Sequence, residues 1–122
     1  MNQTFMIIGS VSAFVAIAIG GARAHLLEKH LPKERIPMLE VGMRYQVVHS
    51  MAILFVALSC AHLQTQLIEC AGWTFLTGIA VFGLIMYGYA LTGWKALLRL
   101  SPLGGVIFLA GWALLAAAAI AG

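Results

Sequence analysis

Residues 102–121 read PLGGVIFLAGWALLAAAAIA, a run that contains no charged side chain. An α-helix needs about 20 consecutive apolar residues to cross the hydrocarbon core of a bilayer, and this run meets that length. A helix that is apolar on every face is either buried inside a large protein or surrounded by lipid. Its length and its lack of charge favour lipid. The run therefore predicts a transmembrane helix.

The composition of the whole chain supports the same conclusion. Hydrophobic residues make up 62% of the chain and charged residues 9%, whereas about a quarter of the residues in soluble proteins are charged. Such a chain cannot supply a polar shell, so the bilayer must act as part of its solvent. The net charge of +3 does not indicate nucleic-acid binding, because the basic residues lie between apolar runs and form no tail or patch.

Three other stretches share the character of residues 102–121, so four membrane crossings are expected. None of the stretches shows the alternation that is typical of membrane-spanning strands. The sequence predicts an all-α, polytopic membrane protein, a four-transmembrane-helix bundle, with residues 1–122 forming a single transmembrane domain. The expected spans are residues 4–24, 39–61, 71–93 and 102–121.

The connections between the spans predict an orientation. Cytoplasmic connections carry an excess of Lys and Arg, and the N-terminus, the connection 62–70 and the C-terminus carry none. Both termini are therefore expected outside, with residues 25–38 as a cytoplasmic loop. That loop is either irregular or forms a short amphipathic helix on the membrane surface. The seven basic residues are Arg23, Lys29, Lys33, Arg35, Arg44, Lys95 and Arg99.

Two cysteines flank the connection on the outer side. Cys60 and Cys70 could form a disulfide in an oxidising compartment. The alternative, which we favour, is two free thiols that act as small apolar residues.

The second span carries the least ordinary stretch, EVGMRYQVVH at residues 40–49. Polar groups at membrane depth face protein or water rather than lipid. Glu40 and Arg44 are four residues apart, so an ion pair on one helix face is expected. Tyr45, Gln46 and His49 share a broad face, and His49 lies roughly 15 Å inside the cytoplasmic end of the span.

Two interpretations of these polar residues remain open. In one, they form a pocket that binds a head group or relays a proton, a role that suits histidine because it titrates near neutral pH. In the other, which we favour, they form hydrogen bonds between helices that fix the helix register. The candidate residues are His25, Arg44, Tyr45, Gln46, His49 and Tyr87.

Small residues recur along three of the spans at helical spacing and predict close helix contacts. Four short helices cannot cover every such face, so we expect membrane lipids as neighbours and either a homo-oligomer or a subunit of a larger membrane complex. The small-residue positions are Ser12, Ala16 and Gly20, then Gly78, Gly83 and Gly88, then Gly104 and Gly111 with Phe108 between them.

Motifs of known chemistry do not occur in the sequence. It has no HExxH, GxSxG or Walker motif. The histidine pairs lack the spacing that would place them on one helix face, and a metal site needs three or four converging ligands. We therefore expect no catalytic residues, no metal and no cofactor.

Several short motifs resemble those of one protein family. Residues 20–26, GGARAHL, are similar to Gly-Ala-Phe-Gly-Ala-His-Gly, and residues 44–52, RYQVVHSMA, resemble Arg-Tyr-Gln-x-x-His-Ala-x-Ala. Phe82 and Tyr87 are spaced as in Phe-Ser-Gly-Ser-Leu-Tyr. Residues 101–105, SPLGG, with a later Gly-Trp pair at 111–112, resemble Thr-Pro-Ile-Gly-Gly followed by Gly-Trp.

In order and spacing, these motifs resemble the domain of unknown function 423 family of small inner-membrane proteins. The resemblance implies a compact four-helix protein of the bacterial inner (plasma) membrane, and it implies no established activity. The chain departs from the pattern where Ala22 and Arg23 replace Phe-Gly and where residues 83–85 replace Ser-Gly-Ser. A site that used those positions would be altered in this chain.

The sequence thus favours a small integral membrane protein with a non-enzymatic role, as an oligomeric or accessory membrane component. Two alternatives use the polar cluster of the second span: a small oligomeric transporter or channel, and a lipid- or quinone-binding protein.

Overall fold

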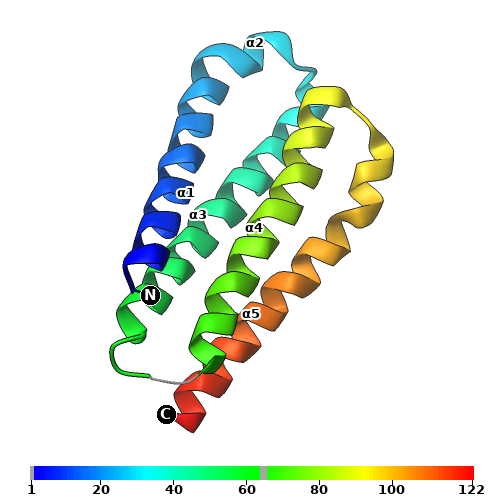
Figure 1. Ribbon diagram of the computed structural model, residues 1–122. Helices are drawn as coiled ribbons and strands as arrows, with labels where there is room; N and C mark the ends of the chain where they lie inside the picture. The colour runs from blue at the N-terminus through cyan, green and yellow to red at the C-terminus, as the bar shows by residue number, and fades with distance from the viewer. Residues whose placement is uncertain (1, 64–65) are drawn as a thin grey trace.

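The computed structural model describes residues 2–63 and 66–122, and within those ranges its regular elements are all helices (Figure 1). Four helical runs are long and apolar enough to cross a membrane, which confirms the predicted all-α, four-transmembrane-helix bundle. The long helices are α1 (Asn2–Ala22), α3 (Ile36–Ser59), α4 (Gln66–Thr92) and α5 (Ser101–Ala121). Residues 64–65 of the expected connection 62–70 lie outside the described residues.

The first helical run continues past residue 24, where the first span was expected to end. A wide π-helical turn, Arg23–Leu27, follows α1 and leads into the short helix α2 (Glu28–His30). The chain then becomes extended at Leu31 and Pro32, and a 3₁₀ turn at Lys33–Arg35 leads into α3. Pro37 fits the first turn of α3 because proline needs no helical N–H partner there. Most of the segment 25–38 is therefore helical.

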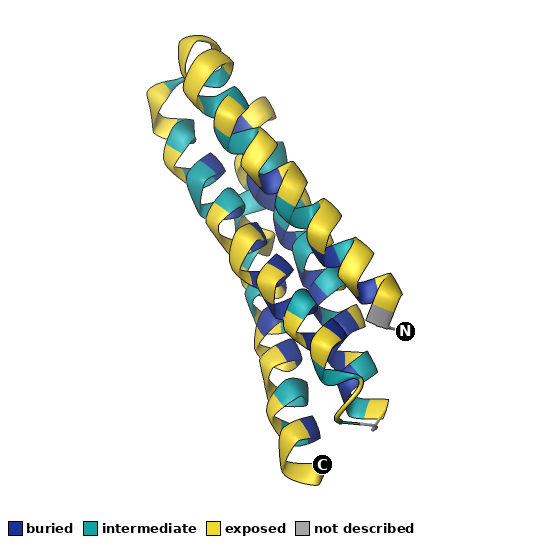
Figure 2. Cartoon of the chain, turned by 90° about the vertical axis from the view of Figure 1, so that its left-hand side faces the viewer, coloured by how far each residue is buried: buried dark blue, intermediate teal, exposed yellow. Residues whose placement is uncertain are grey.

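The four helices pack in chain order: α1 lies along α3, α3 along α4, and α4 along α5 (Figure 1). The two inner helices, α3 and α4, are more buried than α1 and α5. Figure 2 shows buried positions on the inward sides of the helices and exposed positions along their outer sides. Both termini lie at the end of the bundle that also holds the α3–α4 connection.

The interface between α4 and α5 is built from phenylalanine rings that lie against glycines. A Cβ atom added at Gly111 would come within 2.7 Å of the Phe75 ring, and one added at Gly78 would come within 2.5 Å of Phe108. The missing side chains let the helices approach closely, as is usual for packing in lipid. Gly104 lies against Phe82 in the same way. The small-residue face predicted around Phe108 is thus a helix contact inside the chain.

The end of the bundle opposite the termini holds the two basic connections side by side. Helix α4 is terminated by Gly93, whose φ of 75° is left-handed and whose N–H donates to Tyr89 O at 2.7 Å. The Arg35 guanidinium lies against Gly93, and its Nη1 is 3.5 Å from Ala90 O. A 3₁₀ segment, Lys95–Leu100, then leads into α5.

Candidate functional site

Gln46 on α3 joins three helices through its side-chain amide. The residue is buried, with 7% of its surface exposed. Its Nε2 donates to Ser12 O on α1 at 2.8 Å, and its Oε1 accepts from Tyr87 Oη on α4 at 2.7 Å. Buried amides in a membrane protein are costly unless both ends are satisfied. Gln46 meets that condition, and its two hydrogen bonds fix α1 and α4 to α3.

One turn along α3, Ser50 extends this network and is fully buried. Its Oγ is 2.6 Å from Gln46 O, to which it donates. The Ser50 and Ser12 hydroxyl oxygens are 2.7 Å apart. Because the single hydroxyl proton of Ser50 goes to Gln46 O, the Ser12 hydroxyl donates to Ser50 Oγ. Four residues on three helices therefore form one connected set of hydrogen bonds, which we call the Gln46 network: Ser12, Gln46, Ser50 and Tyr87.

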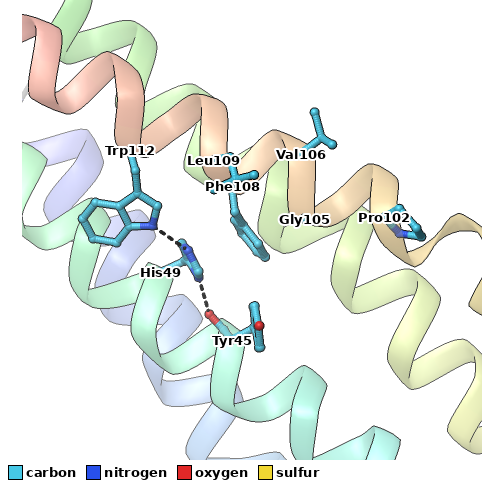
Figure 3. A pocket seen from close by; sticks show the side chains of 8 residues that line it. All are labelled: Tyr45, His49, Pro102, Gly105, Val106, Phe108, Leu109 and Trp112. Atoms are coloured by element: carbon cyan, nitrogen blue, oxygen red, sulfur yellow. Dashed lines mark hydrogen bonds between the residues drawn. The ribbon is translucent and has the colours of Figure 1, made fainter.

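His49 follows Gln46 by three residues, so it lies on a neighbouring face of α3, and it points toward α5 (Figure 3). The indole Nε1–H of Trp112 donates to His49 Nε2 at 3.0 Å. An indole nitrogen can only donate, so Nε2 must carry the lone pair and Nδ1 must carry the proton. His49 Nδ1 lies 2.8 Å from Tyr45 O and donates to it. The geometry therefore defines His49 as a neutral Nδ1–H tautomer with both nitrogens engaged.

Aromatic rings enclose the His49 imidazole. The Phe108 ring stacks on it with centroids 3.7 Å apart and planes 11° apart, and the Phe75 ring lies 5.8 Å away. Beside His49, a groove of about 480 Å³ runs between α3 and α5 (Figure 3). Its lining is mostly apolar and consists of Tyr45, His49, Pro102, Gly105, Val106, Phe108, Leu109 and Trp112.

The predicted site residues therefore fall into separate groups. Gln46 and Tyr87 belong to the Gln46 network, whereas Tyr45 and His49 line the groove between α3 and α5. His25 and Arg44 are exposed, and neither makes a side-chain hydrogen bond or ion pair with the part of the chain that the structure describes.

The expected ion pair between Glu40 and Arg44 is wrong. Glu40 pairs with Arg23 instead, and Arg23 Nη2 also lies 3.2 Å from Glu28 Oε1. The cause is the helical continuation of α1, which holds Arg23 beside the first turns of α3. Arg44 is exposed, as a long basic side chain near a membrane boundary can be.

Both cysteines are free thiols in the structure, so the disulfide stays a prediction for an oxidising compartment. Cys60 is half-buried directly after α3, and Cys70 is exposed on α4. Burial, with a smaller contribution from the Glu69 carboxylate, raises the pKa of the Cys60 thiol. Within residues 2–63 and 66–122, no group of three or more His, Cys, Asp or Glu side chains is placed to hold a metal ion.

Reasoning from sequence missed the pairing of Trp112 with His49. A signal for it exists in the depth of the two residues. Trp112 lies roughly 16 Å from the start of α5 and His49 roughly 15 Å from the end of α3, at 1.5 Å per residue. Indole rings favour the membrane interface, so an indole at mid-membrane needs a buried acceptor, and His49 is the imidazole at that depth.

Comparison with known proteins places the chain among membrane proteins. The family model described as "Protein of unknown function (DUF423)" matches residues 19–105. The UPF0382 inner membrane protein YgdD of Escherichia coli K12 is 34% identical over 124 residues, covering 98% of this chain and 92% of that protein. The UPF0382 membrane protein YwdK of Bacillus subtilis is 29% identical over 119 residues, covering 97% of each chain. No solved structure matches the chain significantly.

Proposed function

This chain belongs to the DUF423 family of membrane proteins, and we propose that it acts as a non-enzymatic component of the bacterial inner membrane. In this proposal it assembles with copies of itself or joins a larger membrane complex. In this proposal the polar residues of α3, the second span, do not catalyse a reaction.

The observation that supports the proposal is that the buried polar side chains, Gln46, His49 and Ser50, are all engaged in hydrogen bonds. A general base needs a free lone pair, and a nucleophile needs a base beside it. His49 uses one nitrogen to accept from Trp112 and the other to donate to Tyr45 O. Gln46 and Ser50 are equally committed to neighbouring helices. Such groups fix helix positions and leave no reactive atom free.

Rigid inner helices and open outer faces suit a protein that works by assembly. Interhelical hydrogen bonds in a membrane contribute about 0.6 kcal/mol each on average, and here they join α3 to each of the other three long helices. The outer helices keep large apolar side chains exposed, among them Phe14 and Ile17 on α1 and Leu109 on α5. Lipid, another copy or a partner protein would cover these faces.

For orientation, we propose that both termini face outward and that the basic connections face the cytoplasm. The support is the excess of Lys and Arg in those connections and their position side by side at one end of the bundle, where Arg35 contacts Gly93.

Native mass spectrometry of the chain purified from its membrane in a mild detergent tests the proposal. We expect a discrete oligomer or a stoichiometric partner protein. His49→Ala should weaken that assembly, because it removes the bond that holds α5 to α3. A wild-type monomer without any partner would contradict the proposal. So would a His49→Ala variant that assembles normally and loses only a solute-dependent phenotype.

A second candidate function, binding of a quinone-like ring, is favoured by the aromatic groove between α3 and α5. Fluorescence of Trp112 in a Trp73→Phe, Trp94→Phe background would be quenched by a bound quinone. Gly105→Phe should abolish the quenching, because Gly105 lines the groove and a Cβ atom there has no neighbour within 4 Å. Equal quenching in that variant would exclude the groove as the binding site.

A further inference from the structure

A second pocket, unrelated to the His49 groove, lies where the first helical run meets the start of α3. Its volume is about 460 Å³, within the range of small-molecule sites. Its lining is Arg23, Glu28, Lys33, Ile36, Pro37 and Glu40. Four of these six side chains are charged, although charged residues make up only 9% of the chain.

The pocket lies at the depth of the lipid headgroups. Arg23 is roughly 30 Å along the helix from Gln3, and Glu40 is roughly 28 Å from the far end of α3 at Ser59, at 1.5 Å per residue. The hydrocarbon core of a bilayer is about 30 Å thick. Both residues therefore lie at one membrane boundary, at the end of the bundle opposite the termini.

The charges in the pocket are arranged as neighbours of opposite sign. Arg23 Nη2 is shared between the carboxylates of Glu28 and Glu40. Glu28 and Glu40 keep 48% and 36% of their side-chain surface exposed, so both can accept further hydrogen bonds. Arg23 Nε is buried and has no acceptor among the described residues. A buried donor without a partner calls for an acceptor from outside the chain.

The backbone at this point is unusual in a way that fits a binding site. Arg23 begins the π-helical turn Arg23–Leu27, and single π turns inside helices occur frequently at functional sites. The turn carries Arg23 and Glu28 into the same pocket from one continuous helical run.

We propose that this pocket binds the headgroup of phosphatidylethanolamine. Two carboxylates would repel a purely anionic headgroup, and Arg23 with Lys33 would repel a simple cation. A zwitterion satisfies both: its primary ammonium donates to Glu28 and Glu40, and its phosphate accepts from Lys33 and from Arg23. A quaternary ammonium, as in phosphatidylcholine, has no N–H to donate. The phosphoethanolamine group comes from a lipid because the pocket lies at the membrane boundary and includes the apolar side chains of Ile36 and Pro37 in its lining.

The proposal is independent of whether the chain assembles, because every lining residue belongs to one copy. The test is native mass spectrometry of the full chain, released from nanodiscs with equal parts of phosphatidylethanolamine, phosphatidylcholine and phosphatidylglycerol of identical acyl chains. We expect one retained phosphatidylethanolamine per chain. Equal retention of the three lipids would overturn the proposal. A stoichiometric adduct with soluble glycerophosphoethanolamine, but not with the lipid, would overturn the lipid assignment.

Matched variants show whether the pocket is responsible. Lys33→Gln and Glu28→Gln each remove one charge from the pocket and leave the Arg23–Glu40 pair in place. Each should lower phosphatidylethanolamine retention by about two- to fivefold, the range for partly exposed charges. The controls Lys29→Gln and Glu34→Gln change the same charges at exposed positions outside the pocket and should have no effect.

Equal loss in the controls, or no loss in the pocket variants, would contradict the assignment. Circular dichroism of each variant keeps the comparison valid, because a variant that folds normally and loses lipid reports on binding alone. If Glu28→Gln proves unstable, Lys33→Gln still decides the question, because Lys33 makes no ion pair within the described residues.

Discussion

Replacing Gly111 with alanine tests the glycine–phenylalanine interface between α4 and α5. A Cβ atom at Gly111 would lie 2.7 Å from both Cδ1 and Cε1 of Phe75, and Phe75 is itself fully buried. The ring cannot turn aside without displacing other core side chains. Forcing an extra methyl into a well-packed core costs about 1–3 kcal/mol.

Gly105 on the same helix supplies the control. A Cβ atom there meets nothing within 4 Å, so Gly105→Ala changes the helix propensity of α5 without a clash. Alanine gains up to about 1 kcal/mol over glycine in a helix, and that gain is common to both variants. Subtracting the two results removes it and leaves the cost of the contact with Phe75.

The assay is unfolding in mixed micelles by titration with sodium dodecyl sulfate, followed by circular dichroism. We expect the free energy of unfolding of Gly111→Ala to be lower than that of Gly105→Ala by about 1–3 kcal/mol. Gly78→Ala and Gly83→Ala form a second pair on α4, because only Gly78 lies against Phe108. Equal stabilities within either pair would refute the close approach of these helices.

The remaining predictions concern the Gln46 network and the thiols. Gln46→Leu should lower the free energy of unfolding by about 1–2 kcal/mol, because it removes the bonds to α1 and α4; Gln66→Leu, at an exposed position, should change it little in the same titration. Burial raises the pKa of the Cys60 thiol, and the thiolate is the reactive form. The maleimide-labelling rate of a Cys70→Ser variant should therefore keep rising with pH above the ordinary thiol value of about 8.5, and a plateau below that pH would contradict it. With the proposed orientation, an impermeant maleimide should label Cys70 of a Cys60→Ser variant from outside intact cells. If this thiol is not labelled from outside, the proposed orientation is wrong.

The fold was predictable because lipid imposes a simple requirement on sequence. Each crossing needs a long apolar run, and the run at residues 102–121 shows this without any knowledge of its neighbours. The small residues of α5 also indicated a packing face, since Gly104, Phe108 and Gly111 share one side of the helix. In the structure that face contacts α4.

The exact partners of the polar residues were not predictable from spacing within one helix. Glu40 has Arg44 four residues away, yet it pairs with Arg23 on another helical run. That choice depends on the π turn and on the continuation of helix past residue 24, which have no clear signal in residues 22–30. The polar cluster likewise divides between two faces of α3, because Gln46 is directed to α1 and α4 while His49 is directed to α5.

His49 is held between two hydrogen bonds, and we propose that it serves structure rather than proton transfer. Nitrogen-15 NMR of the imidazole in micelles at neutral pH is the decisive test. The structure predicts a neutral ring with the proton on Nδ1 and the lone pair on Nε2, and a change in the Nε2 shift when Trp112→Phe removes the donor. An imidazolium, a proton on Nε2, or an Nε2 shift that Trp112→Phe leaves unchanged would contradict the structural role of His49.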